Sequence, residues 1–371
     1  MRIIHIVFES ATSQGSGAPI RNNSIGLGLS RIAQFSTIVV QNYFTSDQAF
    51  PDRKPSYIEA NLPENVVEDI VTRVQAAGCD LVIVEGVFLA DICKRLIDVG
   101  ENVIIDMHNI ESALLRENEL SKYGWFGSLI KSKRWKRAEA AEKAIVEKVK
   151  EVWVCSKSDA ELLKTISDTP PTINILPNPI PAWCSSVEPP SRNADWTIKL
   201  LFVGHLRYRP NIRAIRRLLQ SIFPAIRETF PDAELTICGR NPSKKLRRMA
   251  DRIAGVKLVG DPVDLRPYYA VATIVAAPLT EGGGTRIKIL EAISMGLPII
   301  ATPKAVEGLE LVSNEMFLEA NDDSDLIAAI RKLANDKVLR HKLVNTSQSF
   351  ISRNYAQDII DQALVGLVER K

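Results

Sequence analysis

The stretch PLTEGGGTRIKILEA, residues 278–292, decides how this chain is interpreted. It leads from a predicted strand over 273–277, through the consecutive glycines 282–284, into a helical pattern with Arg286 and Lys288 in its first turn. Glycines let a backbone approach a bulky ligand closely, and a helix start offers unpaired N–H groups and a partial positive charge. The stretch lacks the Gly-Lys-Ser/Thr ending of a P-loop and the spacing of a Rossmann fingerprint, so it predicts another kind of anion site.

On both sides of this stretch, short apolar runs alternate with longer amphipathic runs in two blocks, which is typical of βα units around parallel sheets. Prolines and small polar residues over 179–191 disfavour a helix or a central strand and predict a hinge. We therefore expect an α/β chain of two doubly wound domains, residues 1–185 and 186–354. The predicted buried strands cover 3–8, 37–41, 81–84, 103–105, 151–155 and 174–176 in the first block, and 199–203, 234–238, 257–259, 273–277, 298–301 and 316–319 in the second.

Composition restricts the class of protein further. The chain has 371 residues, and its 47 Lys and Arg against 44 Asp and Glu give a formal net charge of +3. That charge is too small to predict a nucleic-acid partner. The five cysteines are widely spaced and form no C-x-x-C pair, so neither a disulfide framework nor a zinc site is expected. With no apolar run near the ~18 residues of a membrane span and no signal peptide, we expect a cytoplasmic protein.

A series of short motifs in the second block resembles one known family. The motifs are FVG at 202–204 with PN at 210–211, LTICG at 235–239, VG at 259–260, GGGTR at 282–286 followed by Lys288 and Glu291, GLPIIAT at 296–302, and EG at 307–308. In this order they resemble the donor-nucleotide domain of retaining glycosyltransferases with the GT-B fold, in particular family 4, glycosyl transferases group 1. The resemblance covers roughly residues 198–310, and the first block matches more weakly.

The resemblance implies two Rossmann-like domains that face each other across a cleft, with a C-terminal helix over 355–371 that crosses back to the first domain. It implies transfer of a sugar from a UDP- or GDP-linked donor to a hydroxyl of a glycan or lipid-linked acceptor. Bacterial surface polysaccharide, lipopolysaccharide or glycolipid synthesis is the expected setting. The nucleotide-sugar is then a substrate, and neither a cofactor nor a metal is expected.

The resemblance also assigns residues to the donor. Glu291 is expected on the ribose hydroxyls, the base on the backbone near Val259, and the diphosphate on the glycine loop with Arg286 and Lys288. Alternatively, Lys288 and Glu291 pair on the helix surface as neighbours three residues apart. The residues expected to bind the donor are Gly17, Gly204, His205, Arg207, Gly239, Val259, Gly282, Gly283, Gly284, Thr285 and Glu291.

The chain departs from the family pattern at a glutamate. Many relatives carry two glutamates separated by seven residues, and the position of the first one holds Gly283 here, with Glu281 as the nearest carboxylate. This departure keeps open a nucleotide-sugar-binding partner protein without transferase activity. A GT-B-fold nucleotide-sugar epimerase is the other alternative. The amino-acid sequence does not identify the sugar, the base, the acceptor or the oligomeric state.

A second departure concerns cations. Many relatives bring two basic residues from the first loop of this domain to the leaving diphosphate, and these positions hold His205 and Asn211 here. Because the loop cations are missing, we expect Arg286 and Lys288 to be the principal catalytic cations, with His205 or Arg207 assisting.

The first block is expected to serve the acceptor. Gly17 lies in a loop that resembles the family's first glycine loop, although a plain glycine-serine turn has the same composition. Arg21 is a candidate anion contact. His108 follows the fourth predicted strand and matches the family's active-site histidine, the alternative being a structural histidine at a strand end. Asp106 is expected to orient its imidazole, and Glu111 to be a carboxylate at a helix start.

Basic and aromatic residues alternate over Trp125–Arg137. Such a segment can dock on anionic lipid at the inner face of the cytoplasmic membrane. The alternative is an ordinary amphipathic helix whose aromatic side packs on the sheet, and both interpretations stay open at this point.

Overall fold

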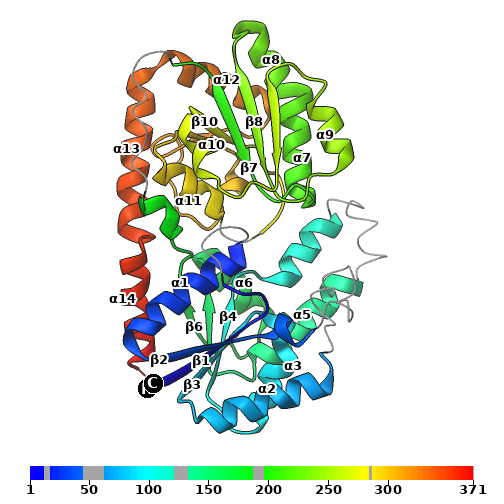
Figure 1. Cartoon of the computed structure of the whole chain (residues 1–371), viewed down its shortest axis with the longest axis vertical. Coiled ribbons are helices and arrows are strands. Elements are labelled where there is room, and N and C mark those ends of the chain that lie inside the picture. Colours follow the sequence, from blue (N-terminus) through cyan, green and yellow to red (C-terminus); the bar gives the residue numbers. More distant parts are fainter. Residues whose placement is uncertain (12–16, 45–61, 121–132, 187–195, 284–285, 371) are drawn as a thin grey trace. The chain divides into compact units, whose positions relative to one another are not determined.

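The computed structural model describes residues 1–11, 17–44, 62–120, 133–186, 196–283 and 286–370 (Figure 1). The chain forms two compact units. Unit 1 contains Met1–Asn178 and Gln357–Lys371, and unit 2 contains Pro179–Gly282 and Arg286–Ala356. The first division therefore falls after Asn178, earlier in the chain than the predicted boundary at residue 185.

Unit 1 is built on a parallel six-stranded sheet in the order β2-β1-β3-β4-β5-β6 (Figure 1). Its inner strands are almost wholly apolar and buried, as expected when helices cover both faces of a parallel sheet. The strands are β1 Arg2–Val7, β2 Gln34–Val39, β3 Leu81–Glu85, β4 Val103–Met107, β5 Glu151–Val154 and β6 Thr172–Ile175. The helices are α1 Gly17–Ile32, α2 Glu64–Ala77, α3 Ala90–Asp98, residues 111–120, α5 Lys133–Val146, α6 Lys157–Ile166 and α14 Gln357–Val368, with short η1 Val40–Tyr43 and η2 Val87–Leu89.

Unit 2 repeats this plan in the order β12-β11-β10-β7-β8-β9. Its strands are β7 Lys199–Val203, β8 Glu234–Gly239, β9 Val256–Gly260, β10 Ile274–Ala277, β11 Ile299–Ala301 and β12 Leu318–Glu319. Its helices are α7 Arg209–Arg217, continued by η4 Leu218–Ile222 and α8 Phe223–Thr229, then α9 Lys244–Ala250, α10 Arg266–Val271, α11 Ile287–Ser294, α12 Asp323–Asn335 and α13 Lys337–Asn354, with short η3 Ala182–Ser186 and η5 Pro303–Ala305. The predicted fold class, two doubly wound α/β units, is confirmed.

The predicted strands differ from the observed ones mainly at their ends. The largest difference is β2, which begins at Gln34 and not at residue 37, and whose residues are mostly exposed or only partly buried. The expectation of a buried strand was wrong there and also at β6 and β9, whose residues are exposed or partly buried, because each of these three strands lies at the edge of its sheet.

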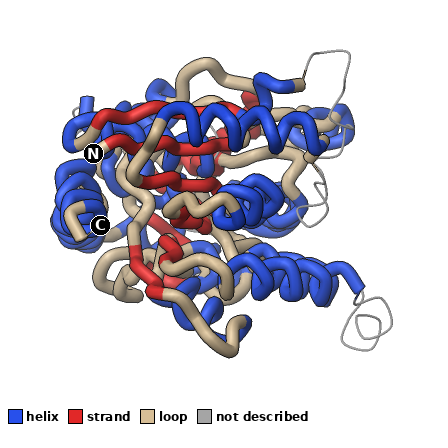
Figure 2. Tube along the Cα trace, turned by 90° about the horizontal axis from the view of Figure 1, so that it is seen from below, coloured by secondary structure: helices blue, strands red, loops and turns tan. Residues whose placement is uncertain are grey.

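The end of the chain returns to unit 1, where α14 packs on α1 (Figure 1). Gly28 of α1 lies at the contact, since a Cβ atom there would stand 2.6 Å from Leu364 Cδ1. Ser24 Oγ donates to Gln357 Oε1 at 2.7 Å, and Gln357 Nε2 donates to the Ser24 carbonyl at 3.2 Å. Figure 2 shows the two termini close together, as expected for segments of one unit.

Each sheet has one point where the order of the strands reverses. In unit 1 it lies between β1 and β3, and in unit 2 between β7 and β10. Open α/β sheets bind ligands beyond the carboxyl ends of the strands at such a switch point. The glycine stretch at 282–284 follows β10, so it begins at the switch point of unit 2.

Candidate functional site

Two glycines bring strand ends together in unit 2. Gly204 follows β7, and Gly239 is the last residue of β8. A Cβ atom on Gly239 would lie 1.6 Å from the Gly204 carbonyl oxygen, so no other residue fits there without moving the backbone. A Cβ atom on Gly204 would lie 2.7 Å from Asn211 Nδ2 and 3.1 Å from Lys288 Nζ. The absence of a side chain at Gly204 therefore leaves room for two polar groups at the switch point.

The two expected cations lie at the start of α11. Lys288 is in the first turn, but Arg286 is the residue before the helix and not part of that turn. The guanidinium of Arg286 is 8% exposed and donates to the Gly282 carbonyl. Lys288 Nζ donates to Asn211 Oδ1 at 3.0 Å and lies 4.9 Å from the centroid of the Phe202 ring.

Lys288 has an unusual electrostatic position. Within the residues that the structure describes, no carboxylate lies at ion-pair distance from its Nζ atom. Burial and the neighbouring Arg286 lower the pKa of Lys288 to about 7. An anion bound beside it would favour the charged form and raise that pKa again.

Glu291 is held in the interior and not on the helix surface. It is 4% exposed, and Tyr269 Oη donates to its Oε2 at 2.7 Å. Burial raises the pKa of Glu291 to about 7, although Tyr269 and Lys288 oppose the shift. Trp183 packs against Tyr269 with ring centroids 5.8 Å apart. The alternative of an exposed Lys288–Glu291 pair is therefore not what the structure shows.

Glu281, the nearest carboxylate to the missing family glutamate, already has a partner. It is 2% exposed, and Arg213 of α7 forms an ion pair with it at 2.5 Å. Arg217 donates to the Pro278 carbonyl at 2.9 Å and to Asp323 at 2.7 Å. These two arginines of α7 hold the chain that follows β10.

Lys288 is bonded to an amide in the first turn of α7, and not to a cation of the loop after β7. His205 and Arg207 are exposed, and His205 Nε2 lies 3.4 Å from Asn241 Nδ2. Asn211, in the first turn of α7, links the loop after β7 to α11. Its Nδ2 donates to the His205 carbonyl at 3.0 Å, and its Oδ1 accepts from Lys288 of α11.

The other predicted donor residues are less informative. Val259 and Gly239 lie at the carboxyl ends of β9 and β8, where Gly239 pairs with Gly260 in the ladder. Gly282 has a positive φ of 103°, a conformation that favours glycine. Gly284 and Thr285 lie outside the described residues, and Gly283 is partly buried.

In unit 1, His108 follows β4 and is paired with a residue that the sequence did not indicate. Its Nε2 lies 3.3 Å from Oε1 of Glu85, the last residue of β3. Glu85 is 2% exposed, and its Oε2 accepts from the Phe8 backbone N–H at 2.7 Å. Burial alone would lower the pKa of His108, but the hydrogen bond and charge of Glu85 outweigh burial and raise it. The available signal for Glu85 was a carboxylate at the end of an apolar strand.

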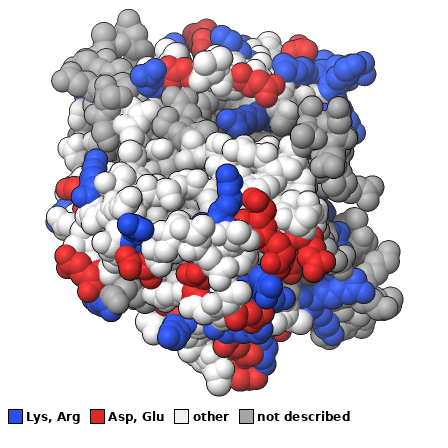
Figure 3. Space-filling model, turned by 60° about the horizontal axis from the view of Figure 1, so that its bottom comes forward, with Lys and Arg blue, Asp and Glu red and all other residues white. Residues whose placement is uncertain are grey.

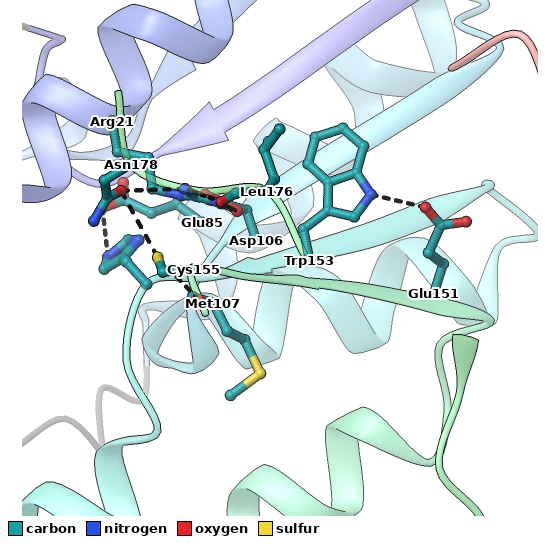
Figure 4. Close-up of polar contacts among 10 residues, drawn as sticks. Arg21, Glu85, Asp106, Met107, Glu151, Trp153, Cys155, Leu176 and Asn178 are labelled. Atoms are coloured by element: carbon teal, nitrogen blue, oxygen red, sulfur yellow. Dashed lines mark hydrogen bonds and ion pairs between the residues drawn. The ribbon is translucent and has the colours of Figure 1, made fainter. Parts of the chain in front are cut away.

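Arg21 and Asp106 do not have the positions expected for them. Arg21 is fully buried and donates to both carboxylate oxygens of Asp106, with Nε 2.8 Å from Oδ2 (Figure 4). Arg21 Nη1 also donates to the Leu176 carbonyl at 2.6 Å and to Asn178 Oδ1 at 3.1 Å. Arg21 is thus an interior ion-pair residue and not an accessible anion contact. Glu85, not Asp106, is the carboxylate bonded to His108.

Glu111 begins the helix over 111–120, as expected, but the capping carboxylate comes from elsewhere. Glu142 of α5 accepts from the Glu111 N–H at 2.6 Å and from the Ser112 hydroxyl. Glu142 is fully buried, and burial raises its pKa to about 7. A carboxylate at a helix start is favourable, so Glu142 fixes this helix against α5.

Gly17 is exposed and is the first residue of α1. Of the segment considered for membrane contact, residues 125–132 lie outside the described residues. In α5, Trp135 lies under Arg116, whose Cζ is 5.2 Å from the ring centroid. Among the described helices, none combines the length and apolar character needed to cross a membrane.

Comparisons with known proteins relate part of the chain to one family. Residues 197–336 match the family described as glycosyl transferases group 1. The chain is 28% identical over 180 residues to a phosphatidyl-myo-inositol mannosyltransferase of Mycobacterium tuberculosis, a match covering 46% of each chain. It is 26% identical over 163 residues to an uncharacterized 44.6 kDa protein in the cps region of Klebsiella pneumoniae, covering 42% of each. The matched region thus spans less than half the length of these curated relatives.

Several solved structures match over the whole chain. Sucrose-phosphate synthase from Thermosynechococcus elongatus has a TM-score of 0.74 at 18% identity and covers 100% of this chain and 99% of its own. HepE from Anabaena, solved in complex with UDP-glucose, has a TM-score of 0.68 at 13% identity and covers 100% of both chains. At these identities the likeness shows the fold, which is GT-B.

Proposed function

We propose that this chain is a retaining glycosyltransferase of family 4, because residues 197–336 match the glycosyl transferases group 1. It moves a sugar from a UDP- or GDP-linked donor to a hydroxyl of a glycan or lipid-linked acceptor. The observation that carries the proposal is the grouping of Lys288 and Asn211 beside Gly204 at the switch point of unit 2, with Arg286 as the residue before α11.

The proposed chemistry follows from where charge develops. As the bond from sugar to diphosphate breaks, negative charge grows on the leaving group, and preorganised cations and N–H groups stabilise it. Arg286, Lys288 and the start of α11 supply these groups, so in this proposal they do the work for which other enzymes use a metal ion. Glu291 binds the ribose through the carboxylate oxygen that Tyr269 does not occupy.

Unit 1 is proposed to serve the acceptor and the transferred sugar, with His108 as the polar group beside the sugar and Gly17, the first residue of α1, as a further contact. The names of the relatives favour a cell-surface product, since one is a phosphatidyl-myo-inositol mannosyltransferase and the other a protein in a cps region. We propose a cytoplasmic location and peripheral contact with anionic membrane through Trp125–Arg137.

The direct test is a panel of UDP-, GDP- and ADP-linked sugars, assayed by thermal shift and by mass spectrometry of the products. A ligand that binds only the folded state raises the melting temperature, so the matching nucleotide identifies itself. We expect one donor to be hydrolysed slowly alone and transferred when glycan or lipid acceptors are added. Binding without turnover would support the partner-protein alternative, and interconverted sugars would support an epimerase.

The low pKa of Lys288 predicts proton uptake when the diphosphate binds. At pH 8, one unit above a pKa of about 7, roughly nine-tenths of Lys288 is neutral in the free protein. Binding of the nucleoside diphosphate raises this pKa, so close to one proton is taken up, and affinity falls as the pH rises above 7. Calorimetry of UDP or GDP binding in buffers of different ionisation enthalpy measures the uptake.

Glu291 titrates near the same pH and must be separated from Lys288. At pH 8 it is already about nine-tenths ionised at a pKa of about 7, so ribose binding releases little proton from it. The Glu291→Gln variant should therefore keep the uptake, whereas Lys288→Met should lose it. Uptake that survives in Lys288→Met would mean that another group takes the proton.

A further inference from the structure

We propose that Glu85 is the positioning residue of the active histidine: it fixes the proton of His108 on Nε2 and ties the imidazole to the segment that leads out of β1. This inference rests on the proposed function, since it concerns how His108 meets the sugar or acceptor.

The placement of Glu85 is the first argument. It is the last residue of β3, beside β1 at the point where the strand order of unit 1 reverses, which is where an open α/β sheet binds its ligands. Glu85 pairs in register with Asp106 of β4, and His108 lies two residues further along. Figure 4 shows Glu85 in this part of the sheet, close to Asp106 and Arg21.

Both carboxylate oxygens of Glu85 are used. Oε2 accepts from the Phe8 N–H at 2.7 Å, and Oε1 faces His108 Nε2 at 3.3 Å. The Phe88 ring packs between the same two residues, 5.7 Å from the Phe8 ring in an edge-on arrangement and 6.4 Å from the His108 ring. Glu85 and Phe88 together link the exit of β1 to the orientation of the imidazole.

The hydrogen bond decides which nitrogen carries the proton. An ionised carboxylate only accepts hydrogen bonds, so His108 Nε2 must donate, and in the neutral imidazole Nδ1 is then the acceptor. Nδ1 is buried and has no hydrogen-bond partner among the described residues. It is the atom left to accept from a ligand hydroxyl, or to donate to one when the ring is charged.

The charges around His108 single out Glu85. The ionisable groups that face His108 are Glu85 from β3, His5 from β1, Asp106 from β4 and Arg21 from α1. Asp106 is matched by its ion pair with Arg21. His5 is neutral, because burial lowers its pKa to about 4. Within this group of four, Glu85 is the carboxylate without a cationic partner other than His108.

The isosteric variant Glu85→Gln tests the inference. The Phe8 N–H needs an acceptor, so the glutamine must turn its oxygen to Phe8 and its NH₂ group to His108. His108 Nε2 then becomes an acceptor and the proton moves to Nδ1. We expect the pKa of His108 to fall. We also expect kcat to drop about 10- to 100-fold with little change in KM for the donor, the effect typical of losing a carboxylate that orients a functional histidine.

Nitrogen-15 NMR of the histidine ring reports the tautomer and pKa directly, with the signal assigned from His108→Gln. Glu151→Gln is the matched control, because Glu151 is also a buried glutamate of this sheet but lies at the other end of its strands, bonded to the Trp153 indole at 2.7 Å (Figure 4). It should keep the wild-type tautomer and kcat. Glu85→Asp keeps a carboxylate and should retain the Nε2 proton.

The outcomes separate the two proposals. If the wild-type protein transfers no sugar, the proposed function fails, but the NMR comparison still decides whether Glu85 governs His108. If Glu85→Gln leaves the tautomer and pKa of His108 as in the wild-type protein, the positioning role is overturned. A shifted tautomer with kcat no lower than in Glu151→Gln would also overturn it, because the proton position would then not matter to transfer.

Discussion

Replacing Arg286 and Lys288 together with alanine is expected to lower kcat/KM for the nucleotide-sugar by a factor of about 10³ or more. Losing one preorganised group that stabilises developing charge costs about 10²–10³ in kcat, and the two cations act on one leaving group. The unit should stay folded with a modest fall in the free energy of unfolding, because the change removes the hydrogen bonds of Arg286 to the Gly282 carbonyl and of Lys288 to Asn211. Steady-state kinetics and urea unfolding of the same preparations give both numbers.

The control removes the same charge from the same unit. Lys332 and Lys337 are exposed residues of α12 and α13, and their double alanine variant should keep wild-type kinetics. The single variants should each lose less than the pair. If the Arg286/Lys288 double variant stays within tenfold of the wild-type protein, the start of α11 is structural and the proposed mechanism is wrong.

The two loop residues predicted to assist are tested by the same assay. His205 and Arg207 are exposed, and Asn211 rather than either of them bonds to Lys288. Arg286 and Lys288 are thus held by hydrogen bonds to Gly282 and Asn211. The assisting role of His205 and Arg207 stays a prediction from the sequence. The kcat/KM values of the single alanine variants of His205 and Arg207 show whether either residue assists Arg286 and Lys288.

Much of the fold was accessible from the sequence because its determinants are local. Inner strands such as β3 and β5 are short apolar runs, and parallel sheets bury such runs on both faces. Among the edge strands wrongly predicted to be buried, β2 has the same apolar character over 37–41, but its exposure depends on lying at the edge of the sheet. Strand order is a property of the whole unit, and the run itself does not encode it.

The candidate site likewise contains residues that the sequence indicates locally and residues that only the folded structure brings to their partners. The glycine stretch and Lys288 were visible because a backbone that must approach a ligand closely needs glycine, and the requirement is written in consecutive residues. Tyr269, Glu85 and Glu142 were missed because each meets its partner only after folding, from 22, 23 and 30 or more residues away. Their types and neighbours in sequence do not distinguish them from surface residues.

Arg21 misled for a further reason. Arginine is almost never fully buried unless it is paired, so a loop-proximal arginine is reasonably expected to be exposed. Here Asp106, 85 residues away, accepts from it through both oxygens, and the carbonyl of Leu176 and the amide of Asn178 accept from its remaining nitrogen. Three parts of unit 1 thereby meet on one guanidinium: α1, β4 and the segment that follows β6.

This network predicts a large loss of stability when its charge balance is broken. Asp106→Asn keeps the shape but leaves the Arg21 charge buried without a counter-charge, which costs about 3–5 kcal/mol in comparable buried pairs. Burial would raise the pKa of Asp106, but the charge and hydrogen bonds of Arg21 outweigh it and lower the pKa. The wild-type protein should therefore lose this contribution only as the pH falls below the ordinary range of an aspartate, and Asp106→Asn should lack that acid-dependent part. Urea unfolding over a pH series measures both.

Two comparisons make the result specific to the buried pair. Glu68→Gln breaks the exposed Arg95–Glu68 pair of the same unit, 2.6 Å long, and should change the free energy of unfolding little. The double variant Arg21→Met, Asp106→Leu removes both charges and should be less destabilised than the sum of the two single changes, because neither charge is then stranded. If Asp106→Asn were as stable as Glu68→Gln while KM rose, Arg21 would be a ligand contact after all. The contacts of Arg21 with Asp106, Leu176 and Asn178 argue for the opposite result. Asp106→Asn should lower the free energy of unfolding and leave KM for the nucleotide-sugar nearly unchanged.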